Sequence, residues 1–98
     1  MTINKSLEGT KLEISLEGRL DTTTAPSLEA ELKKSLNGIT ELVFDFANLE
    51  YISSAGLRIL LASEKVMNKQ GSMAIKNVNE VINEVFEVTG FSGILTII

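Results

Sequence analysis

The sequence predicts an α/β domain built on a mostly parallel sheet, and three observations support this. Apolar and polar residues alternate over residues 11–20, which is the period of a strand with one solvated face. Residues 42–46 are apolar except for one aspartate, as in a parallel strand buried on both faces. Other segments repeat apolar residues at helical spacing. The expected order is ββαβαβαβ, with right-handed crossovers between the parallel strands.

The first part of the chain is expected to form a hairpin and then a helix. A weak strand at residues 3–7 turns through residues 8–10 into the strand at 11–20, which makes this first pair antiparallel. Residues 21–26 (DTTTAP) combine capping side chains with a proline suited to a first helical turn. The Asn-Gly pair at 37–38 ends this helix. Three leucines form its inner face: Leu28, Leu32 and Leu36.

The second part is expected to add strands and helices in alternation. A buried strand at 41–46 is followed by a connection at 47–52 and a long helix at 54–69. The parallel partner of the buried strand is expected at 73–75, and a last strand at 94–98.

A third helix is expected between these last two strands. It begins with Asn77, and Glu80 three positions later completes a capping box. Residues 89–90 (Thr-Gly) end it. Its inner face contains Val78, Val81, Ile82, Val85 and Phe86.

Length and composition limit the classes of function. The 98 residues form one domain, with 44% hydrophobic and 22% charged residues. The formal charge of −4 argues against nucleic acid or an anionic membrane as the main partner, because both require a basic surface. No segment reaches the roughly 20 apolar residues of a membrane span, and residues 1–10 do not resemble a signal peptide. The cytosol is the expected compartment.

The chain contains no cysteine and no histidine. Disulfides, thiolate nucleophiles, Ser-His-Asp hydrolysis and imidazole metal sites are therefore excluded. Carboxylates, hydroxyls, lysines and backbone groups remain for any chemistry. This composition favours a modified or binding protein, not an enzyme, with no cofactor and no metal expected.

The start of the long helix is the candidate site. A helix beginning near Ser54 leaves its first N–H groups without intrahelical acceptors and carries a partial positive charge, which suits a phosphate. At about 100° per residue, Lys65 and Lys69 lie within about 20° of Arg58, and Ser54 lies about 40° away, so the four form a polar stripe. The predicted core-facing side contains Ile59, Leu60, Ser63, Val66 and Met67.

Leu57 and Leu61 are expected between the polar stripe and the core side, next to Ser54. Both docking on a partner and packing within the fold are compatible with this position. Ser54 itself could serve only as a helix-capping hydroxyl. Arg58, four residues after Ser54, could hold two phosphate oxygens with its planar guanidinium group.

Four fragments in order resemble the anti-sigma-factor antagonists of the STAS domain family. The resemblance covers nearly the whole chain and implies the STAS fold. The fragments are residues 18–21 (GRLD) with Thr24, residues 43–46 (VFDF), residues 51–57 (YISSAGL) and residues 88–91 (VTGF).

The resemblance implies a bacterial partner-switching protein. In that family the unphosphorylated form binds an anti-sigma factor that is also a serine kinase, which frees the sigma factor; a serine phosphatase reverses the modification. The family run Asp-Ser-Ser/Thr-Gly-Leu-Gly aligns with Ser53–Arg58, so Ser54 is the implied acceptor. Ser53 replaces the aspartate and Arg58 the last glycine.

The expected contacts around the phosphosite are Ser53, Gly56, Leu57, Arg58, Leu61, Asp21, Thr24 and Asp45, in a protein that is a monomer or weak dimer.

Two other functions remain open at this point. Asp21, Asp45 and Lys76 all fall at predicted strand ends, where a receiver-like domain gathers the acidic groups that bind Mg²⁺ and accept a phosphoryl group. Alternatively, Asp21 caps the first helix and Asp45 holds the loop that leads to Ser54. A STAS module without phosphorylation, acting as a scaffold or binding a small ligand, is the third possibility.

Overall fold

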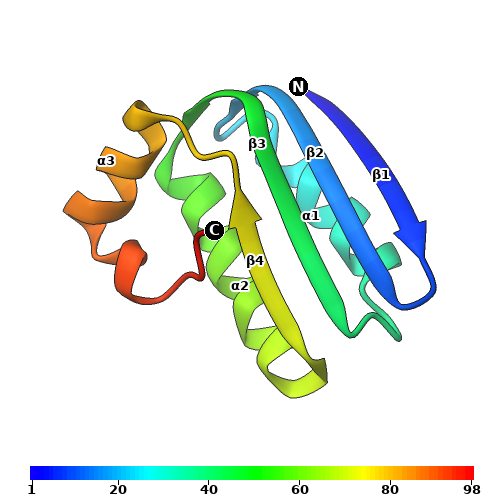
Figure 1. Ribbon diagram of the computed structural model, residues 1–98. Helices are drawn as coiled ribbons and strands as arrows, with labels where there is room; N and C mark the ends of the chain where they lie inside the picture. Colours follow the sequence, from blue (N-terminus) through cyan, green and yellow to red (C-terminus); the bar gives the residue numbers. More distant parts are fainter.

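A four-stranded sheet in the order β1-β2-β3-β4 forms the centre of the computed structural model, which describes all 98 residues (Figure 1). β1 and β2 are antiparallel, whereas β2, β3 and β4 are parallel, as predicted. The elements are β1 Thr2–Glu8, β2 Lys11–Leu20, α1 Ala25–Ser35, β3 Glu41–Ile52, α2 Ser54–Gln70, β4 Ser72–Lys76, α3 Glu80–Thr89 and the 3₁₀ turn η1 Phe91–Gly93.

Both α1 and α2 cover the same face of the sheet, and α3 lies at its end beside β3 (Figure 1). Alternation in β2 turns its apolar side chains toward these helices and leaves Glu13, Ser15 and Glu17 on the other face. The sequence prediction that β3 is covered on both faces is therefore wrong in part. Only Val43 is buried on the open face, where Lys76 Nζ reaches across β3 to Glu13 Oε1 at 2.8 Å.

One hydrophobic core fills the space between the sheet and the helices. Its largest fully buried side chains come from β2, α1, β3, α2, β4 and α3, so all of these elements share one core. They include Ile14, Leu16, Leu28, Leu42, Phe44, Phe46, Leu60, Met67, Ile75 and Phe86.

The predicted last strand at 94–98 is wrong. After α3, Gly90 adopts a left-handed φ of 82° and the chain turns through η1. Only one parallel bridge, between Ile75 and Ile97, joins the C-terminal segment to β4. Two hydrogen bonds form it: the Ile75 N–H donates to the Thr96 carbonyl, and the Ile98 N–H donates to the Ile75 carbonyl, each at 2.9 Å.

The start of α3 also differs from its prediction. Asn79, not Asn77, is the N-cap, and its Oδ1 accepts from the Ile82 N–H at 2.9 Å. Asn77 has a left-handed φ of 60°, which asparagine tolerates better than most residues, and its side chain donates to Asp45. Val81 was expected on the inner face of this helix, but it is 58% exposed.

Candidate functional site

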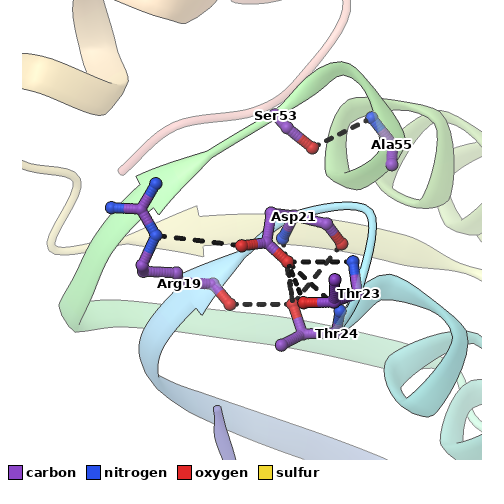
Figure 2. Close-up of polar contacts among 6 residues, drawn as sticks. All are labelled: Arg19, Asp21, Thr23, Thr24, Ser53 and Ala55. Atoms are coloured by element: carbon purple, nitrogen blue, oxygen red, sulfur yellow. Dashed lines mark hydrogen bonds and ion pairs between the residues drawn. The ribbon is translucent and has the colours of Figure 1, made fainter.

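The starts of α1 and α2 lie side by side at one edge of the sheet. In the register of β2 and β3, Leu20 pairs with Ile52, and the Ser53 N–H donates to the Leu20 carbonyl at 2.9 Å. The two loops that follow these parallel strands therefore meet, as Figure 2 shows. The candidate site is the surface formed by these two helix starts.

The start of α1 is a closed hydrogen-bond network (Figure 2). Asp21 Oδ1 accepts from the Thr23 N–H at 3.0 Å, the Thr23 hydroxyl at 2.7 Å and the Thr24 N–H at 3.2 Å. The Thr24 hydroxyl donates to the Arg19 carbonyl at 2.8 Å and accepts from the Asp21 N–H at 2.9 Å. Hydrogen bonding from Thr23, strongest from its hydroxyl, holds the pKa of Asp21 below its ordinary value.

This network assigns structural roles to two predicted site residues. The N-cap of α1 is Thr24, so the prediction that Asp21 caps this helix is wrong. The Thr24 side chain makes no capping bond to the helix. Asp21 instead holds the turn that precedes the helix, by accepting from the turn's own N–H groups.

Arg19 is a neighbour of this site that the sequence alone did not single out. Its guanidinium carbon lies 4.4 Å from the centre of the Tyr51 ring, and its Nε lies 3.8 Å from Asp21 Oδ2. The register shift between Gly18 and Arg19 pairs Arg19 with Tyr51. Both residues occur in the recognised fragments, but only the register brings them together.

The start of α2 is much less enclosed. Ser53 is the N-cap, and its Oγ accepts from the Ala55 N–H at 3.2 Å (Figure 2). Ser54 is the first helical residue and is exposed. The exposure places the Ser54 hydroxyl within reach of solvent and of other molecules. The rest of the predicted polar stripe is also exposed, which confirms that stripe: Arg58, Lys65 and Lys69.

Gly56 allows α2 to begin this close to the sheet. A Cβ atom at this position would lie 2.7 Å from Ile52 Cγ1 and 2.7 Å from Leu20 Cγ, both core side chains. Only a residue without a side chain fits between the helix and the ends of β2 and β3. Gly56 is buried, so its role in this structure is to position the start of α2, where Ser54 lies.

Three predictions for the faces of α2 need correction or refinement. Leu57 was expected at the boundary beside Ser54, but it is 6% exposed and belongs to the core, because this side of α2 turns into the protein. Leu61, one turn later, is half-buried and keeps part of its surface free. Val66, predicted to face the core, is 40% exposed.

A small hollow separates the first turns of α1 and α2. Its volume is about 230 Å³, and Arg58 from α2 faces Thr22 and Pro26 across it. The exposed Arg58 side chain thus borders both this hollow and the polar stripe that begins at Ser54.

Asp45 does not join this site. β3 continues to Ile52, so Asp45 lies inside the strand and not at its end as predicted. Its Oδ1 accepts from the Asn77 side chain at 2.9 Å and from the Ala47 N–H at 3.0 Å. The Asn77 hydrogen bond is the main reason that the pKa of Asp45 lies below its ordinary value.

The receiver-like arrangement is absent. Asp45 pairs in register with Ser15, whereas Asp21 follows Leu20, so about six residues of strand, or roughly 20 Å of backbone, separate the positions of the two aspartates. Lys76 forms an ion pair with Glu13. No group of three or more acidic side chains in the protein is arranged to hold a metal ion.

Comparison with known proteins identifies the family to which the chain is similar. The family model described as "Mlab, STAS domain" matches residues 3–96. The chain is 37% identical over 84 residues to "Putative anti-sigma factor antagonist BtrV" of Bordetella bronchiseptica, covering 84% of this chain and 72% of that protein. It is 26% identical to the anti-sigma-B factor antagonist of Bacillus subtilis, covering 88% of this chain and 80% of that one.

A solved structure shows the same fold. The Bacillus cell fate determinant SpoIIAA in its phosphorylated form superimposes with a TM-score of 0.77 at 17% identity, covering 99% of this chain and 91% of that chain. Fold and site thus define a STAS-type α/β domain. The chain belongs to the STAS domain family of anti-sigma-factor antagonists, a family of regulatory proteins.

None of the helices is both long enough and apolar enough to cross a membrane.

Proposed function

We propose that this protein is an anti-sigma-factor antagonist whose binding to its anti-sigma factor is switched off by phosphorylation of Ser54. The observation that carries the proposal is the position of Ser54, an exposed hydroxyl on the first residue of a long helix. Relatives named as anti-sigma factor antagonists, and a phosphorylated protein of the same fold, support it.

The helix start accommodates a phosphate without a change of fold. The phosphoryl group adds about −1.5 to −2 charges at pH 7, and a helix N-terminus stabilises a nearby anion by about 0.3–1 kcal/mol. Arg58 is exposed four residues further along α2, where its guanidinium group can reach phosphate oxygens.

The replacement of aspartate by Ser53 leaves the fold of this segment intact. Serine and aspartate are both good N-cap residues, and the Ser53 hydroxyl makes the capping bond to Ala55. What changes is one negative charge beside the acceptor, which removes a group that could help to engage the kinase and costs the helix only the small stabilisation of an anion at its N-terminus.

Rejection of the partner is the proposed mechanism of the switch. In the unphosphorylated state, Ser54 and the free part of Leu61 contact the anti-sigma factor. Enclosing a dianion in that interface without a matching positive group on the partner costs several kcal/mol of desolvation. A loss of about 3–4 kcal/mol weakens binding by two to three orders of magnitude.

The proposed partners are an anti-sigma factor with serine kinase activity and a serine phosphatase. The protein itself supplies no catalytic group and acts as a monomer or weak dimer. Because sigma factors act in the cytosol, the switch operates there.

Mass mapping after incubation with the cognate kinase and ATP tests the proposal. We expect one phosphate on Ser54 in the wild type, none in Ser54→Ala, and unchanged modification in Ser27→Ala. Ser27 is the matched control because it is an exposed serine in the first turn of α1. Phosphate on another residue, or no phosphate at all, would contradict the proposal.

A ligand-binding STAS module is the second candidate, and one observation favours it. A groove of about 380 Å³ runs between α1 and α2, with apolar walls that include Leu32, Ile59 and Val66. Apolar pockets of this size accept small molecules. If Ser54 stays unmodified and a small ligand shifts the amide NMR signals of the residues that line this groove, the second function replaces the first.

A further inference from the structure

One face of α3 exposes two valine side chains that are not part of the hydrophobic core. Val81 is 58% exposed and Val88 is 81% exposed, and Val85 between them is half-buried and packs in part against the core. Residues spaced at i, i+4 and i+7 lie on one side of a helix. These three residues are called the valine stripe.

The attachment of α3 to the protein depends on residues other than Val81 and Val88. Ile82 and Phe86 are fully buried in the core. Asn79 caps the helix and donates through Nδ2 to the Leu49 carbonyl at 2.8 Å, which ties the helix start to β3. Since Val81 and Val88 contribute little to this attachment, their exposure has no evident structural purpose.

The charges of α3 all have one sign. The helix contains Glu80, Glu84 and Glu87 and no lysine or arginine. At about 100° per residue, Glu84 falls about 60° from Val81, so a carboxylate borders the valine stripe directly. The face therefore combines a narrow apolar strip with an acidic border.

We propose that the valine stripe docks on an apolar surface of another protein whose border carries lysine or arginine. Charge complementarity selects such a partner and suppresses wrong ones. A second copy of this chain fits poorly, because two α3 helices packed along their stripes would bring the glutamates of both copies together. The site does not involve Ser54, so it is independent of the proposed switch.

A synthetic helical peptide can serve as the probe. It has leucine on one face and lysine on both flanks, and a matched peptide carries glutamate in place of lysine. Titration of the ¹⁵N-labelled protein should give shifts centred on the valine stripe with the lysine peptide and none with the glutamate peptide. Affinity should fall at least tenfold in the double variant Val81→Gln, Val88→Gln.

Three controls make the test specific. Leu7→Gln removes an exposed apolar side chain from β1, away from the groove and from α3, and should bind the lysine peptide like the wild type. Ser54→Asp should also bind it normally, which separates this site from the switch. Glu84→Gln should weaken binding and reduce its dependence on salt.

Several results would overturn the proposal. These are shifts centred on the groove between α1 and α2, shifts spread evenly over the acidic surface, or binding unaffected by the double valine variant. Concentration-dependent dimers in sedimentation that disappear in the double variant would assign the stripe to a second copy instead.

Discussion

The two helix starts at the same edge of the sheet differ in how they satisfy their polar groups. At the start of α1, the Asp21 carboxylate accepts three hydrogen bonds from Thr23 and Thr24, and the Thr24 hydroxyl bonds to the Arg19 carbonyl and the Asp21 N–H. At the start of α2, one bond from Ala55 to Ser53 caps the helix, and Ser54 stays exposed.

The difference agrees with the proposed division of this edge into a structural α1 start and a regulatory α2 start. The polar side chains at the start of α1 form hydrogen bonds within their own turn. Few of their donors and acceptors are therefore free to bind a partner. The α2 start leaves a hydroxyl free on a helix whose position is fixed by Gly56 and Leu57. A phosphorylation site needs this combination of a rigid backbone and an exposed acceptor.

Substitution of two leucines one turn apart on α2 should distinguish a residue that stabilises the fold from a residue of the proposed interface. Leu57→Ala should lower the free energy of unfolding by about 2–5 kcal/mol, because it leaves a cavity in the core. Leu61→Ala should cost on the order of 1 kcal/mol, since the side chain is only half-buried, and should weaken binding of the anti-sigma factor. Urea unfolding and calorimetric titration measure the two quantities.

Similar stability losses for the two leucine variants, with unchanged binding by Leu61→Ala, would mean that Leu61 also belongs to the fold alone.

Gly56→Ala tests whether close packing sets the position of the α2 start. The added Cβ meets Leu20 and Ile52 at 2.7 Å, so we expect a loss of about 1–3 kcal/mol in thermal or urea unfolding. Gly93→Ala is the matched control, because a Cβ there meets nothing within 4 Å. Equal stability of the two variants would show that α2 can move away from the sheet at no cost.

Asp21→Asn tests the closed network of α1 through pH. The folded pKa of Asp21 lies below its ordinary value, so its ionised form stabilises the protein above about pH 4. This contribution disappears as the pH falls through the lowered pKa. Urea unfolding between pH 6 and 2 should therefore give a flatter pH dependence for Asp21→Asn than for the wild type. An unchanged pH dependence of the unfolding free energy would mean that the ionised Asp21 side chain does not stabilise the fold.

The parallel sheet and the α2 site could be predicted because both depend on local patterns. Alternation in β2, the apolar run in β3 and the serines before a helical repeat each specify structure within a few residues. The exposure of Ser54 and Arg58 followed from the wheel geometry, and the structure confirms it.

The errors arose where distant contacts decide the outcome. Residues 94–98 have strand-like composition, but only Ile75 on β4 pairs with them. The second half of β3 was missed because its pairing with β2 depends on register shifts near Glu17 and Arg19. The burial of Leu57 reflects how α2 is rotated against the sheet, which the helix period alone does not specify.

The central claim is that charge on Ser54 decides partner binding while the fold stays the same. Calorimetry on Ser54→Asp, with Ser27→Asp as control, measures melting temperature and affinity for the anti-sigma factor on the same samples. We predict a 100- to 1000-fold weaker Kd for Ser54→Asp, a melting temperature within about 2 °C of wild type, and no change in Kd for Ser27→Asp. A large fall in melting temperature with unaltered affinity would contradict the claim and make Ser54 a purely structural residue.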